Sequence, residues 1–88
     1  MGELYRIGKM VIYLRFFDTQ QHHKPHVHVK YNDDAEVIAV DGEILSGALP
    51  ERQQRILNGW LAFHEDEVYE RWNLAVQGKP FEKIVAMI

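Results

Sequence analysis

The sequence contains no cysteine, which excludes disulfide bonds, thiol catalysis and cysteine-ligated zinc. It has no apolar run approaching the roughly 18 residues that a membrane-spanning helix needs, and its first residues lack the pattern of a secretion signal. Thr19 and Ser46 are its only hydroxyl residues of the serine and threonine type, and neither stands in a triad context. No glycine-rich phosphate-binding loop occurs. These absences predict a cytoplasmic protein without a membrane contact and without a cofactor.

The size and composition predict one globular domain over residues 1–88. The chain is 47% hydrophobic and 26% charged, and 88 residues suffice for a single core. A net charge of −3 argues against a bulk-basic nucleic-acid binder. The charge is unevenly spread, however. Residues 1–32 hold five Lys or Arg residues and two acidic residues, whereas residues 33–88 hold five Lys or Arg residues and eleven acidic ones. Four of the five histidines also lie in the first part. One face can therefore be locally positive.

The first half of the chain is typical of β-strands, because β-branched and aromatic residues form short runs between turn residues. The turn signals are Gly8-Lys9 and Asp41-Gly42. The polar segment 18–25 predicts a surface loop. The predicted strands cover residues 4–7, 10–17, 26–31 and 36–40, with a short fifth strand at 43–45.

The second half is typical of helices. Pro50 suits a first helical turn, apolar residues then recur at spacings of three and four, and Gly78 followed by a proline predicts the end. Two helices are expected, with a break near His64 and Asp66 as the N-cap of the second. Trp60 and Trp72 are assigned to the core. The fold class is α+β, a mostly antiparallel sheet of four to five strands packed on two C-terminal helices, with the other sheet face partly open. The apolar tail 81–88 is expected to dock on the body or on a partner.

A histidine cluster, His22-His23-Lys24-Pro25-His26-Val27-His28, is the sharpest chemical signal. Side chains at positions i and i+2 of a strand point to the same face. His26 and His28 should therefore project together from the open face or the edge of the sheet. Val27 and Val29 should point into the core.

Three roles for this cluster remain open. In the first, His26 and His28 act as base and acid in metal-free RNA cleavage, because imidazole titrates near neutral pH. Positive charge for the developing phosphorane can come from Lys30, Lys24 or Arg15. Base stacking can come from Tyr13, Phe16, Phe17 or Tyr31.

In the second role, His26 and His28 chelate a metal ion, and His22, His23 or Asp18 in the loop completes the set. In the third, the histidines are structural and bond to the backbone or to a carboxylate such as Glu36. His64 is interpreted as a helix-terminal residue.

Several stretches of the chain resemble a family of small bacterial proteins, domain of unknown function 4160. Its most specific segment reads aspartate-His-x-Pro-Pro-His-x-His, and Pro25-His26-Val27-His28-Val29 resembles it. Lys24 stands in place of the first proline, and Asp18 does not directly precede His22. Further matching stretches are Ile7-Gly8 with Val11-Ile12-Tyr13, residues 41–50, the set Trp60, His64, Glu65 and Trp72, and Pro80 with Glu82, Lys83 and Ile84.

The resemblance implies one component of a toxin–antitoxin-like gene pair, with a protein partner encoded nearby and RNA as a target. The family's histidines fall on His22, His26 and His28. The resulting hypothesis is an RNA-cleaving toxin with His26, His28 and Lys30 in the catalytic set. Contacts to substrate or partner are then expected from Arg15, His22, Lys24 and Tyr31. The alternatives are a non-catalytic protein-binding module, for which the apolar tail permits a homodimer, and a histidine-cluster metal protein.

Overall fold

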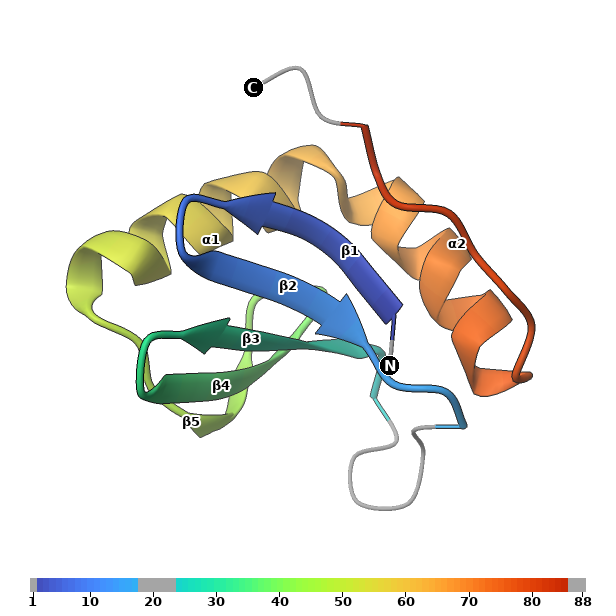
Figure 1. Cartoon of the computed structure of the whole chain (residues 1–88), viewed down its shortest axis with the longest axis horizontal. Coiled ribbons are helices and arrows are strands. Elements are labelled where there is room, and N and C mark those ends of the chain that lie inside the picture. Colours follow the sequence, from blue (N-terminus) through green and yellow to red (C-terminus); the bar gives the residue numbers. More distant parts are fainter. Residues whose placement is uncertain (1, 18–23, 86–88) are drawn as a thin grey trace.

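The computed structural model describes residues 2–17 and 24–85. Five strands precede two helices, and the strands form one antiparallel sheet in the order β1-β2-β3-β4-β5 (Figure 1). This arrangement confirms the predicted α+β fold. The elements are β1 (Gly2–Ile7), β2 (Met10–Leu14), β3 (His26–Tyr31), β4 (Asp34–Ala39), β5 (Ile44–Gly47), α1 (Glu51–Phe63) and α2 (Glu65–Val76). None of the helices in the described part has both the length and the apolar character needed to cross a membrane.

The second strand is shorter than the sequence predicts. It ends at Leu14 rather than at Phe17, because Phe17 has a left-handed backbone (φ 58°) that leaves the extended conformation. The Phe17 N–H donates instead to the carbonyl of Ala75 in α2, at 2.9 Å. The chain after β2 is thereby attached to the end of the last helix.

The predicted break between the helices is confirmed at His64. This residue ends α1 with φ −107° and directly precedes α2. The N-cap of α2 is His64, not Asp66, and no side chain caps it. Asp66 lies within the first turn, where it and its acidic neighbours Glu65 and Glu67 interact favourably with the positive end of the helix dipole.

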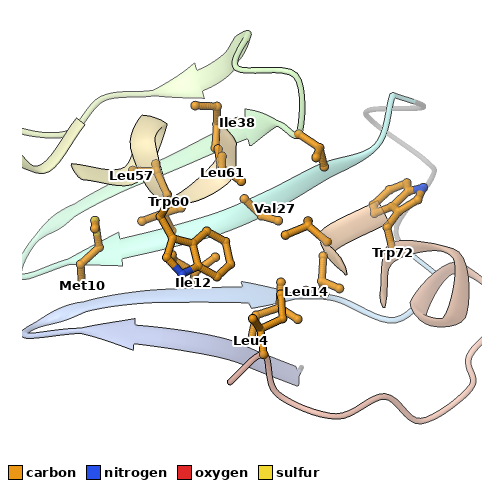
Figure 2. Packing of buried hydrophobic residues seen from close by; sticks show 14 of the residues in the cluster. Leu4, Met10, Ile12, Leu14, Val27, Ile38, Leu57, Trp60, Leu61 and Trp72 are labelled. Atoms are coloured by element: carbon orange, nitrogen blue, oxygen red, sulfur yellow. The ribbon is translucent and has the colours of Figure 1, made fainter. Parts of the chain in front are cut away.

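The core lies between the helices and one face of the sheet. Trp60 is 3% exposed and Trp72 is 5% exposed, so both are core residues as predicted. Figure 2 shows Trp60 beside Ile12, with Trp72 at the opposite end of the cluster. Burying one large apolar side chain stabilises a fold by about 1.5–3 kcal/mol. The cluster comprises Leu4, Met10, Ile12, Leu14, Val27, Val29, Ile38, Val40, Leu57, Trp60, Leu61, Val68, Trp72, Ala75 and Ile84.

The strand register assigns every side chain to one of two faces. Directly paired residues point to the same side of an antiparallel sheet. Ile12, Val29 and Glu36 form one cross-strand row on the helix-covered side. The opposite side is called the open face here. It carries the row Glu3, Tyr13, His28, Val37, Ser46 and the row Arg6, Val11, Lys30, Ala35.

The segment after α2 docks on the first strand. The Ile84 N–H donates to the carbonyl of Leu4 at 3.0 Å, and Ile84 is 2% exposed. The ring of Phe81 fills the space beside Gly2, where a Cβ would overlap it. The expected docking on the body is therefore observed for this part of the tail, whereas residues 86–88 lie outside the described residues.

A carboxylate is buried on the helix-covered side of the sheet. Glu36 is 2% exposed, and among the residues that the structure describes neither of its oxygens has a hydrogen-bond partner. Burial raises the pKa of Glu36 above its usual value of 4.5, an effect that the nearby Gln54 amide partly offsets. That amide donates to Asn58 Oδ1 at 3.1 Å. The charged form of Glu36 is thus disfavoured in the folded protein.

We predict that Glu36→Gln stabilises the protein at neutral pH. Because the folded-state pKa is raised, the contribution of Glu36 to stability is fully present below pH 4.5 and is lost as the pH rises through the folded pKa. The substitution should raise the free energy of unfolding at pH 7 by about 1–3 kcal/mol and flatten its decline above pH 4.5. Urea denaturation between pH 4 and 8 measures this. Exposed Glu82→Gln is the control, and equal pH profiles of Glu36→Gln and wild type would contradict the prediction.

We predict that Gly47→Ala destabilises the protein more than Gly8→Ala does. Both glycines have positive φ, which disfavours an L side chain by about 1 kcal/mol. A Cβ at Gly8 meets no atom within 4 Å, whereas one at Gly47 overlaps the carbonyl oxygen of Ala35 on the neighbouring strand. Relief of this overlap requires the backbone to shift, which should add about 1–3 kcal/mol to the loss of folding stability in Gly47→Ala. Thermal unfolding of the two variants tests this, and equal losses would refute the steric explanation.

Candidate functional site on the open face of the sheet

The two strand histidines are neighbours, but both are more buried than the sequence predicts. His26 and His28 share one side of β3, and their rings meet edge to face with centroids 5.3 Å apart. His26 is 0% exposed and His28 is 6% exposed. The reason for the burial of His26 is Trp72 of α2, whose ring lies 4.7 Å from the imidazole.

His26 is held in one orientation by the backbone. Its Nδ1 lies 2.7 Å from the carbonyl oxygen of Lys24, an acceptor, so Nδ1 carries a proton. The neutral ring then has its basic nitrogen at Nε2. With Trp72 on the ring and a backbone bond at Nδ1, His26 is suited to support its neighbour rather than to contact a ligand.

His28 lies in a small hollow of the open face. The hollow has a volume of about 130 Å³ and is lined by Tyr13, Arg15, His28, Val29, Ala35, Glu36, Val37 and Ser46. The strand register directs the Glu36 carboxylate to the helix-covered side, away from the His28 imidazole. The Tyr13 ring stacks on the imidazole with centroids 5.4 Å apart and an angle of 22° between the planes. Arg15 is exposed, so its guanidinium can reach a ligand at this site. An imidazole, a guanidinium and a hydroxyl in one small hollow suit an anionic ligand.

Ser46 is a site residue that sequence reasoning missed. It lies 18 residues after His28 and has no motif around it. Its place follows only from the register, in which Tyr13 pairs with His28, His28 with Val37, and Val37 with Ser46. Two features together could have found Ser46: the alternation of side chains between the two faces of each strand, and the order of the strands in the sheet.

A second hollow adjoins the first on the open face. It has a volume of about 340 Å³ and is lined by Glu3, Arg6, Val11, Tyr13 and Lys30. Tyr13 lines both hollows. The Glu3 carboxylate accepts from Arg6 at 2.9 Å and from Lys83 at 3.2 Å. Both hydrogen bonds lower the pKa of Glu3 below its usual value, and the bond from Arg6 has the larger effect.

The charge of the open face differs from that of the whole chain. Three cationic residues are exposed on the open face, namely Arg6, Arg15 and Lys30. The two cross-strand rows of this face contain one acidic residue, Glu3. The helices carry acidic clusters instead, with Glu65, Asp66 and Glu67 in the first turn of α2. A protein of net charge −3 therefore presents a cationic sheet surface, as the uneven charge of the sequence suggested.

Other predicted contact residues lie elsewhere. Tyr31 pairs with Met10 and packs on the core, on the side of the sheet opposite His28. Lys24 forms ion pairs with Asp41 and Glu43, each at 2.7 Å. The hydrogen bond to Asp41 has the largest effect and that to Glu43 the next, and both raise the pKa of Lys24 above its usual range. The hydrogen bond from Lys24 likewise lowers the pKa of Asp41.

The two phenylalanines proposed for base stacking serve the fold instead. Phe16 packs against Phe81 of the tail, with ring centroids 5.6 Å apart. The Phe17 ring occupies the space beside Gly78 at the end of α2. Of the four aromatic residues named from the sequence, only Tyr13 contacts the histidine pair within the described ranges.

His64 lies at the helix junction, as predicted, and away from the open face. Its Nδ1–H donates to Glu67 Oε1 at 2.7 Å, and its side chain is 3% exposed. Within residues 2–17 and 24–85, the buried Nε2 has no hydrogen-bond partner, and the same holds for Nε1 of Trp60. The two rings have centroids 5.1 Å apart. This residue joins the helices to the core and takes no part in the hollows.

Residues 2–17 and 24–85 do not provide a ligand set for a metal ion. No group of three histidine or carboxylate side chains there is arranged to hold an ion. The predicted loop ligands His22, His23 and Asp18 lie outside the described residues. The described geometry offers acid–base and anion-binding chemistry, centred on His28, Arg15 and Lys30.

The similarity of this chain to known proteins lies at the level of a protein family. No curated protein and no solved structure matches this chain. The model of a protein family described as a domain of unknown function, DUF4160, matches residues 10–73. The matched region runs from β2 into α2 and includes His28, Lys30 and Ser46. The chain therefore belongs to the DUF4160 family.

Proposed function

We propose that this protein binds single-stranded RNA on the open face of its sheet and cleaves it with His28 as the acid–base group. The observation that carries the proposal is the position of His28 in a hollow with Arg15, beside a second hollow that holds Arg6 and Lys30. Cationic side chains attract the phosphate backbone. A flat sheet face with a half-buried aromatic ring, that of Tyr13, suits unpaired bases.

The cleavage step needs one proton acceptor at the 2′-hydroxyl of the ribose. In the proposal, the His28 imidazole takes that proton while the 2′-oxygen attacks phosphorus. The bond from phosphorus to the 5′-oxygen breaks, and the 5′-oxygen takes a proton from water. The products are a 2′,3′-cyclic phosphate and a 5′-hydroxyl. Arg15 and Lys30 stabilise the additional negative charge of the transition state.

His26 is a positioning residue in this mechanism. Its ring edge contacts His28 at a centroid distance of 5.3 Å, and its own orientation is fixed by Lys24 and Trp72. This differs from the sequence hypothesis, in which both histidines touch the substrate. Complete burial of His26 favours the division of roles proposed here.

We predict that loss of a single cation on the open face weakens RNA binding. Arg15→Gln and Lys30→Gln should each lower the affinity for a single-stranded oligoribonucleotide about five-fold, an effect of about 1 kcal/mol. Each should also reduce the slope of log affinity against log salt by about 0.7. Fluorescence anisotropy between 50 and 200 mM salt measures both. Exposed Lys79→Gln removes the same charge outside the sheet and serves as the control. Equal losses in all three variants would reject the open face as the binding surface.

We predict that wild-type protein cleaves RNA in the presence of a chelator and that His28→Asn lowers the rate at least about 100-fold, the usual contribution of a general acid–base group. His26→Asn should lower the rate less, and both variants should retain RNA affinity. Gel analysis of a labelled oligoribonucleotide, with end-group identification, measures this. An unchanged rate in folded His28→Asn would reject the mechanism.

The same variants test a wider role. We propose that the protein is the RNA-directed component of a toxin–antitoxin-like gene pair, with a protein partner encoded nearby. Induced expression in a bacterial host should then arrest growth for wild type and not for His28→Asn at equal soluble levels. Growth of both strains would argue against a toxin.

A second candidate is a non-catalytic protein-binding module. The observation that favours it is an apolar groove of about 350 Å³ between β1 and α1, lined by Tyr5, Ile7, Arg55, Ile56, Gly59, Trp60 and Phe63. Phe63 is 64% exposed at its edge, and exposed apolar surface of this kind marks protein contacts. Failure of folded wild type to bind RNA would favour this candidate, with a homodimer as the first assembly to test by sedimentation.

A further inference from the structure

We propose that the larger hollow of the open face is a nucleobase-binding pocket, and that the smaller hollow beside it takes the phosphate of the same nucleotide. The inference rests on the proposed function, because it names what the open face recognises in RNA. It assigns separate roles to two adjoining sites. The base lies over Val11 and Tyr13, and the phosphate lies near His28 and Arg15.

The two hollows have the spacing that one nucleotide requires. Val11 and Tyr13 are two residues apart on β2, and Lys30 and His28 are two apart on β3. At about 3.4 Å per residue, Val11 and Lys30 lie about 7 Å along their strands from Tyr13 and His28. The ribose of a single nucleotide can bridge that distance. Tyr13 lines both hollows and so forms the wall between base and phosphate.

The lining of the larger hollow suits a flat, mainly apolar ring. Its volume of about 340 Å³ is within the range of small-ligand pockets. Val11 supplies an aliphatic floor, and the ring of Tyr13 supplies a stacking surface. Lys30 and Arg6 add alkyl stems that cover a ring while their charged ends remain in water.

Glu3 gives this pocket a hydrogen-bond acceptor. Its pKa is lowered by Arg6 and Lys83, so the carboxylate is ionised at neutral pH. Its oxygens can accept from the amino group at the edge of a base such as adenine. The smaller hollow has a different lining, with the hydroxyl of Ser46, the imidazole of His28 and the guanidinium of Arg15. Glu36 also lines it, but the strand register places that carboxylate on the helix-covered side. The contrast between the two linings assigns base and phosphate to their places.

The test compares two ligands that differ only by the base. Isothermal titration calorimetry at low salt should show that adenosine 5′-monophosphate binds wild type about ten-fold more tightly than ribose 5-phosphate, the effect of one base stacked on an aromatic side chain. Val11→Trp fills the larger hollow and should reduce this ratio to about one. Ile44→Trp places the same side chain at an exposed strand position outside both hollows and should preserve it. Tyr13→Leu is the second variant and should also lower the ratio.

The outcomes separate this inference from the proposed function. Equal binding of the two ligands by wild type overturns the base pocket, and so does a ratio that Val11→Trp and Tyr13→Leu leave unchanged. If an oligoribonucleotide still binds in those cases, RNA binding stands and only the base pocket fails. If the oligoribonucleotide does not bind while the nucleotide ratio behaves as predicted, the pocket stands as a nucleotide site and the proposed function fails.

Discussion

The register of β3 between its two neighbours is the constraint on which the rest of the structure depends. Four consecutive residues of this central strand, His26 to Val29, are buried, so neither of its faces is freely exposed to solvent. The valines enter the core and the histidines point to the opposite side. A slip of one residue would place both imidazoles among the aliphatic core residues of β2 and β4 and would turn the valines to the opposite side. The core therefore fixes the position of the histidine pair.

Segregation of charge gives the sheet face a property that the net charge conceals. The chain is acidic overall, yet three cations surround the two hollows, and the acids gather at the start of α2. Such an arrangement orients an approaching polyanion, because the helix end repels it while the sheet attracts it. Screening by salt weakens both effects, so the preference for one orientation is greatest at low ionic strength.

Sequence patterns were sufficient for the element order, for the helix break at His64 and for the direction of the β3 side chains. They were insufficient where contacts join distant parts of the chain. Trp72 buries His26 from 46 residues away, and Ser46 reaches the row of His28 only through two further strands. The inward position of Glu36 also contradicts the polar-outward rule, since Val37 occupies the outward position beside it. Local propensity carries no information about these long-range pairings.

The first strand has a consequence for how the protein behaves at high concentration. β1 is an edge of the sheet, and exposed edges invite pairing with other chains. Here the segment after α2 lies over part of that edge, with Ile84 bonded to Leu4 and Phe81 seated on Gly2. These residues cover part of the β1 edge and hinder its pairing with strands of other molecules. A chain truncated after Gly78 would keep most of its core but would leave this part of the β1 edge open to pairing with another chain.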